Sequence, residues 1–200
     1  KKIPVRREFH ETIVAAPMSV RDPDIPIGSY HHIGRAVEVS SIAAGNPDSD
    51  APDILAKDLD VIFVGLNPSL KSAEVGHYYA GPGNQFWPFL HKAGFTDRQL
   101  TPDEDTTVLD YGIGLTDVVK RPTRGVNDLA KREFSPGLDG LRPKLIEYRP
   151  GTVAFNGKSG YQNAIGGRID YGLQSDDLEG IPVFVCPSTS GALPIPRDRK

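Results

Sequence analysis

The run from Asp60 to Leu66, Asp-Val-Ile-Phe-Val-Gly-Leu, is the feature that most limits how this chain can fold. It is rich in β-branched residues, apolar on both sides, and stops at Asn67-Pro68. A short run with no polar face to turn toward water predicts a buried strand of a parallel sheet. Such a sheet needs helices packed on both of its faces.

The rest of the chain supplies further strands in alternation with helices. Strands are predicted over 113–119, 152–155 and 181–186, and helices over 84–92, 101–110 and 158–164 and from Ser135 onward. The helix at Thr101 begins with a Thr-Pro-x-Glu capping box. The helix from Ser135 should bury the stripe Leu138, Leu141, Leu145 and Ile146. The alternation predicts an α/β fold, a three-layer α/β/α sandwich around a mainly parallel, four-stranded sheet.

The chain divides into two parts by composition. Residues 1–57 are rich in Pro, Asp, Ser and Gly and show no sustained helical or strand period, which predicts an irregular arm that packs on or flanks the domain. Residues 58–200 are expected to form one domain, since a chain of this length can bury a single core.

Composition excludes several classes of protein. A single cysteine, Cys186, allows neither an internal disulfide nor a four-thiolate cluster, and no His, Cys or Asp group has metal-ligand spacing, so we expect neither a metal nor a cofactor. The net charge of -3 argues against coating of nucleic acid by bulk electrostatics, although it permits a local basic patch. No apolar run is long enough for a bilayer, so we expect a soluble, cytoplasmic protein with no membrane partner.

Polar side chains follow the predicted strands at the edge where parallel sheets bind ligands. Asn67 comes directly after the first strand and Asp117 closes the second. Asn67 can hold a reactant or close a turn, and its own segment leaves both open. Asp117 can act as a general base or stabilise a cation, and the alternatives are a helix cap or a salt bridge to Lys120 or Arg121.

Six segments occur together in one order: Gly65-Leu-Asn-Pro68, Ala80-Gly-Pro-Gly-Asn-Gln-Phe-Trp87, Ala93-Gly-Phe-Thr96, Leu109-Asp-Tyr-Gly-Ile-Gly-Leu-Thr116, Arg121-Pro-Thr123 and Pro187-Ser-Thr-Ser-Gly191. In this arrangement the chain resembles the mismatch-specific uracil/thymine DNA glycosylase family of the uracil-DNA glycosylase superfamily. The resemblance implies a monofunctional hydrolase that flips uracil, thymine or another altered base out of mismatched duplex DNA and excises it, which initiates base excision repair. It also implies a protein of bacterial, cytoplasmic type that joins the nucleoid during repair. We expect a monomer, because one flipped base needs one pocket.

The resemblance implies roles for particular residues. Asn67 would orient the attacking water, and Tyr79 would stack on the flipped base, although Tyr79 can also be an ordinary loop aromatic. The other base-contacting residues expected in this loop are Leu66, Ser69 and Leu70, where backbone N–H groups can stabilise the departing anion. Ser69 stands where glycine is common in the family and can crowd the pocket near the base carbonyl. A tighter pocket would favour uracil over thymine, but one methyl group is rarely worth more than about 1–3 kcal/mol, so the sequence leaves the range of substrates open.

The expected DNA contacts lie in two loops. They comprise Lys71, Ser72, Ser188, Thr189, Ser190 and Gly191, with Ala192 or Leu193 filling the space that the flipped base leaves. Two alternatives remain open from the sequence. One is a damage-binding protein of the same fold that has lost hydrolysis, and the other is a nucleotide-processing α/β hydrolase that uses the same strand-end crevice.

Overall fold

The computed structural model describes residues 52–191. Most of the predicted arm therefore lies outside the described residues, as do both candidates for the inserted side chain, Ala192 and Leu193. Within the described residues, no helix has the length and apolar character needed to cross a membrane.

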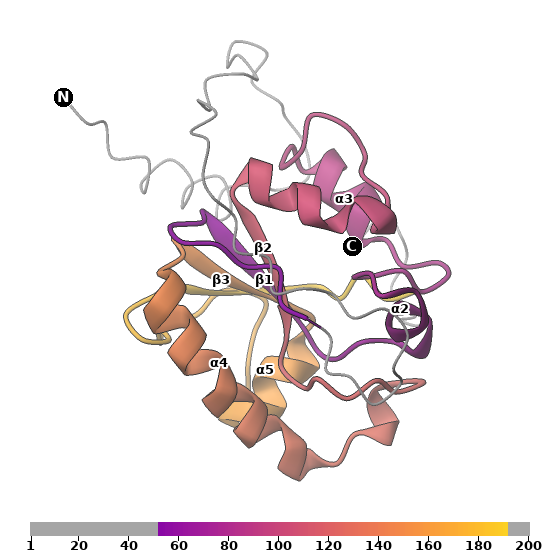
Figure 1. Cartoon of the computed structure of the whole chain (residues 1–200). Helices are drawn as coiled ribbons and strands as arrows, with labels where there is room; N and C mark the ends of the chain where they lie inside the picture. The colour runs from indigo at the N-terminus through magenta and orange to yellow at the C-terminus, as the bar shows by residue number, and fades with distance from the viewer. Residues whose placement is uncertain (1–51, 192–200) are drawn as a thin grey trace, which may run out of the picture. The chain divides into compact units, whose positions relative to one another are not determined.

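A five-stranded sheet forms the centre of the described part, in the order β2-β1-β3-β5-β4 (Figure 1). Its parallel strands are β1 (Val61–Gly65), β2 (Ile113–Asp117), β3 (Thr152–Asn156) and β5 (Val183–Cys186). The two-residue strand β4 (Gly172–Leu173) pairs antiparallel with β5 at one edge. The predicted α/β class and mainly parallel sheet are confirmed, and β4 is the strand that the four-stranded prediction lacked.

Helices cover both faces of the sheet. Helices α4 (Phe134–Tyr148) and α5 (Lys158–Ile165) lie on one side of the sheet, and α3 (Phe86–Lys92) lies on the other (Figure 1). The helix predicted at Thr101 is the 3₁₀ helix η1 (Pro102–Tyr111), which Gly112 ends with a φ of 70°. Short helices that the sequence did not indicate are α2 (Leu70–Val75), η2 (Val126–Asp128) and η3 (Lys131–Glu133).

Alternate residues of β1 pack on opposite faces of the sheet. Ile62 and Val64 join one core cluster with the α4 residues Leu138, Leu141 and Leu145. On the other face, the ring of Phe63 meets Phe86 and Phe95 edge to face, with centroids 5.4 and 5.6 Å away. Burying each such side chain contributes about 1.5–3 kcal/mol.

The predicted α4 stripe is wrong at its last member. Leu138, Leu141 and Leu145 are buried, but Ile146 is 53% exposed. Successive residues of an α-helix are rotated by about 100°, so Ile146 turns away from the sheet once Leu145 faces it.

The last residues of the predicted arm, 52–57, pack along β2. Ile54 makes an antiparallel bridge with Leu115 and is 2% exposed. Asp53 receives hydrogen bonds from Lys120, Lys144 and Thr116. Burial acts to raise the pKa of Asp53, but the two lysines and the threonine outweigh it, so this pKa is lowered. This short segment thus attaches to the strand end that carries Asp117.

Candidate functional site

The carboxyl ends of the parallel strands lie side by side and gather the loops that follow them. Gly65 at the end of β1 pairs with Asp117 at the end of β2, and Asn156 at the end of β3 pairs with Cys186 of β5. The chain from Asn67 to Tyr79 therefore starts next to Asp117, on the edge where α/β sheets bind ligands.

Asn67 bridges two of these loops through its side-chain amide. Its Nδ2 donates to the carbonyl of Arg121 and to Oγ1 of Thr123, both at 2.9 Å, and to the carbonyl of Pro68 at 3.1 Å. None of the described residues donates a hydrogen bond to its Oδ1. The amide is held from its nitrogen side, which leaves its oxygen available as an acceptor that can orient water but cannot take a proton.

Asp117 folds over Gly65 and is almost fully buried. Its Oδ1 lies 2.1 Å from the point where a Cβ on Gly65 would stand, so the arrangement requires glycine there. Asp117 itself is 6% exposed, and its carboxyl makes no hydrogen bond or ion pair with another described residue. The alternative partners are engaged elsewhere, because Lys120 contacts Asp53 and Arg121 contacts Glu133.

The environment of Asp117 favours its protonated form. Burial is the largest cause and raises the pKa of this carboxyl to about 7, with Lys120 acting against the rise and Asp53 adding to it. Near neutral pH, Asp117 can therefore be either a hydrogen-bond donor or an anion.

Tyr79 reaches the same point with its hydroxyl group. Its backbone is left-handed, with a φ of 55°, and its ring stacks on Phe86 with centroids 3.8 Å apart and planes 21° apart. Its Oη lies 3.3 Å from the position of a Gly65 Cβ. This hydroxyl is buried without a hydrogen-bond partner of acceptable geometry, although the amide of Asn156 is close. Burial, and next the charge of Asp117, raise the pKa of Tyr79 well above its usual value.

Gly65 thus lies beneath the carboxyl of Asp117 and the hydroxyl of Tyr79, and this hydroxyl is buried without a hydrogen-bond partner among the described residues. Native proteins rarely leave such groups without partners, because each costs about 1–3 kcal/mol. Their convergence at the carboxyl edge of the sheet is typical of a site for a ligand with hydrogen-bonding groups.

Residues 52–200 match the family model described as the Uracil DNA glycosylase superfamily. The chain belongs to this superfamily. Its members are DNA glycosylases, which are hydrolases that act on DNA, and this supports the enzyme class, the DNA partner and the repair role expected from the sequence. The finer assignment to the mismatch-specific family stays a prediction.

The other residues predicted to contact the base direct their side chains elsewhere. The Ser69 hydroxyl caps α2 by accepting from the Ser72 amide at 3.0 Å, and it donates to the Ser72 hydroxyl. Leu66 lies against α5 near Gly160, and Leu70 is 50% exposed. Their backbone groups remain the candidates for base contact, and the crowding expected from Ser69 is directed toward Gly81.

Of the predicted DNA contacts, some are exposed and some are interior. Lys71 is exposed and pairs with Glu74, whereas Ser72 is buried and its hydroxyl accepts from the amide of Ala80. In the second loop, Ser188 Oγ accepts from the Ser190 amide, and Gly191 lies close to the Gly83 carbonyl. Thr189 is buried, and both its amide and its hydroxyl are hydrogen-bonded to other residues.

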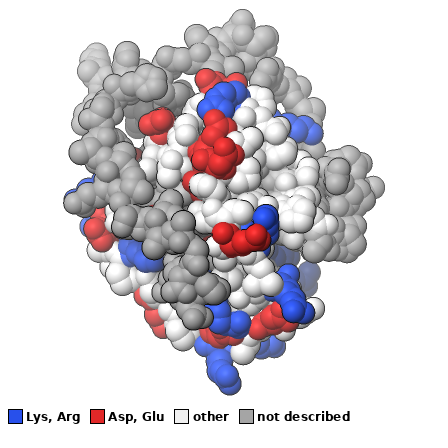
Figure 2. All heavy atoms as spheres, turned by 45° about the vertical axis from the view of Figure 1, so that its right-hand side comes forward, with Lys and Arg blue, Asp and Glu red and all other residues white. Residues whose placement is uncertain are grey.

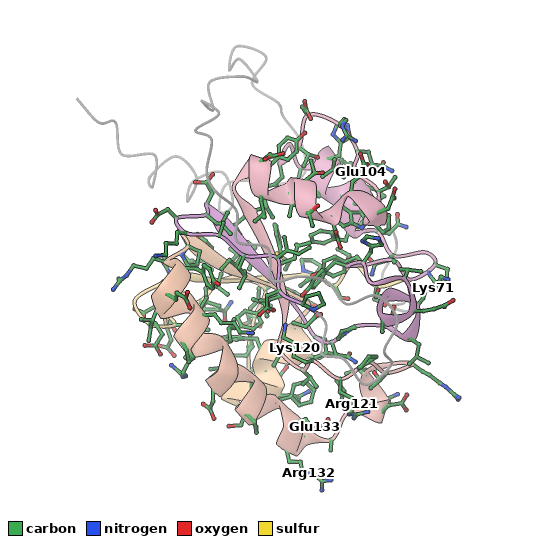
Figure 3. All side chains as sticks on the ribbon, viewed as in Figure 1. Lys71, Glu104, Lys120, Arg121, Arg132 and Glu133 are labelled. Carbon is green, nitrogen blue, oxygen red and sulfur yellow. The ribbon has the colours of Figure 1, made fainter. Side chains whose placement is uncertain are left out.

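A cavity of about 530 Å³ lies beside this edge, between the start of α4 and residues 118–121. Four cations line it, namely Lys120, Arg121, Arg132 and Lys144. In Figure 3, Arg121, Arg132 and Glu133 lie near the start of α4. Lys120 and Lys144 contact Asp53, and Arg121 contacts Glu133, so most of this charge is already paired. No predicted base-contacting residue lines the cavity.

The sequence did not indicate Asp53, because a lone Asp in an irregular segment carries no pattern.

The charged side chains do not form a field of one sign on the face seen in Figure 2, where acidic and basic groups lie next to each other. Among the described residues, no three His, Cys, Asp or Glu side chains gather in a way that could hold a metal ion.

Proposed function

We propose that this chain is a monofunctional DNA glycosylase that flips uracil out of mismatched duplex DNA and cuts its bond to the sugar. Thymine and other altered bases opposite guanine are further candidate substrates. The observation that carries the proposal is the convergence of Asp117 and Tyr79 over Gly65, on the sheet edge where Asn67 is held with its oxygen free. A flipped pyrimidine offers both a flat ring and a polar edge to such a site.

The proposed division of labour follows from the chemistry of each group. Cleavage builds positive charge on the sugar and negative charge on the departing base. Asn67 orients the attacking water through Oδ1, and an amide cannot take up the proton that this water loses. The reaction is therefore expected to be slow and to depend on a good leaving group.

Asp117 is the second group proposed to act in the reaction. In its ionised form, a carboxylate at this place can stabilise the cationic sugar or accept a proton from water. With a pKa of about 7, it is only partly ionised in neutral solution. Base release should therefore rise with pH through this region if the ionised form acts.

Tyr79 is proposed as the wall on which the base stacks. One face of its ring is covered by Phe86, and the other face is the one proposed to meet the base. Stacking of a base on an aromatic side chain is worth about 1–3 kcal/mol and tolerates different bases. The proposed DNA contacts are Lys71 and, in the loop after β5, Ser188, Ser190 and Gly191.

The proposal is tested with labelled duplexes that carry G·U, A·U or G·T and with single-stranded DNA that carries uracil, followed by alkaline cleavage of abasic sites. We expect cleavage of the G·U duplex and weaker or no cleavage of G·T. Equal cleavage of all four substrates would remove the mismatch requirement while leaving the glycosylase activity in place.

Two outcomes would overturn the proposal. Tight binding of the G·U duplex with no abasic product would assign the chain to damage binding without hydrolysis. Hydrolysis of free nucleotides in preference to DNA would assign it to nucleotide processing.

A further inference from the structure

Thr189 connects three segments that are distant in the sequence. Its amide donates to Oδ1 of Asn156 at 3.0 Å, and Nδ2 of Asn156 donates to its Oγ1 at 2.9 Å. That hydroxyl in turn donates to Oδ1 of Asn84 at 3.0 Å. The carbonyl of Thr189 accepts from the amide of Gln85 at 2.9 Å. Thr189 therefore ties the loop after β5 to the end of β3 and to the segment before α3.

The donor and acceptor directions in this group of residues support one another. The Thr189 amide can only donate, so it must face the oxygen of Asn156, which turns the Asn156 nitrogen toward the Thr189 hydroxyl. The hydroxyl then has its hydrogen free for Asn84 Oδ1, which also accepts from the amide of Phe86 at 3.0 Å. A hydroxyl is required here, since it donates to one amide and accepts from the other.

We infer that Thr189 is a positioning residue that holds the DNA-facing loop in place, rather than a contact to phosphate. The hydroxyl hydrogen that a phosphate would need is already donated to Asn84. At 9% exposure, Thr189 has little surface to offer DNA, whereas its neighbours Ser188 and Ser190 are only partly buried.

The same bonds link the loop to the proposed base wall. Oδ1 of Asn84 accepts a hydrogen bond from the amide of Phe86, and the ring of Phe86 stacks on Tyr79. Close approaches leave little freedom in the loop, because a Cβ on Gly191 would lie 2.9 Å from the carbonyl of Gly83. Displacing Thr189 should therefore move the residues that face the DNA backbone and loosen the support of Tyr79.

The inference rests on the proposed function, and its test compares Thr189→Val with Thr189→Ser. Valine keeps the shape and removes both hydroxyl bonds, and serine keeps the hydroxyl. Thr106→Val makes the same chemical change at an exposed position of η1 and serves as the matched control. KM and kcat for excision from the G·U duplex, the affinity for undamaged duplex, and hydrogen exchange of the Gln85 and Thr189 amides are measured for each.

We expect Thr189→Val to raise KM by about tenfold or more, because both hydrogen bonds of the hydroxyl are lost, and to weaken binding of undamaged duplex by a similar factor. Its kcat should change far less, and the Gln85 amide should exchange at least about tenfold faster because its acceptor moves. Thr189→Ser and Thr106→Val should behave as the unaltered protein.

Three results would overturn the inference. They are unchanged KM and exchange in Thr189→Val, a defect in Thr189→Ser as large as in Thr189→Val, or a fall confined to kcat. If the unaltered protein excises no base, the proposed function fails, and amide exchange and duplex affinity still decide the role of Thr189.

Discussion

The carboxyl oxygen of Asp117 occupies the space that a side chain on Gly65 would fill, 2.1 Å from the ideal Cβ position. The two residues are paired in register at the ends of β1 and β2. Glycine at the end of a buried strand therefore makes room for a carboxyl group, and the carboxyl comes to lie beside the hydroxyl of Tyr79.

Gly65→Ala should displace Asp117 and disturb the site. The added methyl group would collide with the Asp117 carboxyl and approach Tyr79 Oη, so we expect a loss of about 1–3 kcal/mol in the free energy of unfolding and a large loss of base release. Urea denaturation and single-turnover excision measure the two effects. The control is Gly140→Ala in α4, where a Cβ meets nothing within 4 Å, and it should stabilise the protein by about 0.5–1 kcal/mol. Normal activity of Gly65→Ala would show that the position of Asp117 does not matter.

Asp117→Asn should change how stability depends on pH. The folded-state pKa of about 7 lies above the ordinary value of 3.8 for an Asp carboxyl, so the folded state holds this proton more tightly than the unfolded state does. The stabilisation from proton binding is complete below about pH 4 and is lost as pH rises to about 7. Asparagine carries no such proton, so the free energy of unfolding of the variant, relative to that of the unaltered protein, should be higher at pH 8 than at pH 5. The change between the two pH values should be on the order of a few kcal/mol.

Urea denaturation of both proteins at pH 5 and pH 8 measures this difference directly. Comparing the two proteins removes the contribution of Asp53, whose lowered pKa acts with the opposite sign. A stability difference that is the same at both pH values would mean that Asp117 is not buried in the way described.

Tyr79→Phe should separate stability from function. The hydroxyl is buried without a well-aligned partner, so its removal should leave the free energy of unfolding unchanged or raise it by about 1 kcal/mol. The ring and its stacking on Phe86 are kept. If the hydroxyl contacts the base edge, single-turnover excision should slow by about tenfold or more. A clear loss of stability in this variant would reveal a bond to the hydroxyl within the protein.

The sheet was predictable because buried parallel strands leave a plain pattern. The run ending at Gly65 is apolar on both faces, the strand starting at Ile113 opens with Ile-Gly-Leu before Thr116 and Asp117, and each is bounded by polar or turn-forming residues. The strand β4 has only two residues, too few for any periodicity to register. Helix α2 has six residues, and its N-cap at Ser69 lies in a segment whose polar residues gave no helical period.

The site was predictable in its location but less so in its contacts. The rule that parallel strands end at a common edge placed Asn67 and Asp117 together, and the structure pairs the strand ends accordingly. Sequence could not show that Asp53 would take the lysine expected for Asp117, since that depends on how residues 52–57 pack on β2. Nor could it show that Thr189 is interior while its neighbours are more exposed, because a loop has no fixed period.

Single-turnover release of uracil from a G·U duplex by Asn67→Ala, set beside Asp117→Asn, tests the central claim most directly. Asn67 is held by Arg121 and Thr123 with its oxygen free, so alanine should reduce the rate by about 10²-fold or more while duplex affinity changes by only a few fold. Asp117→Asn should fall between Asn67→Ala and the unaltered enzyme. Release by Asn67→Ala at the rate of the unaltered enzyme would contradict the account, and full activity of Asp117→Asn would remove Asp117 from the mechanism.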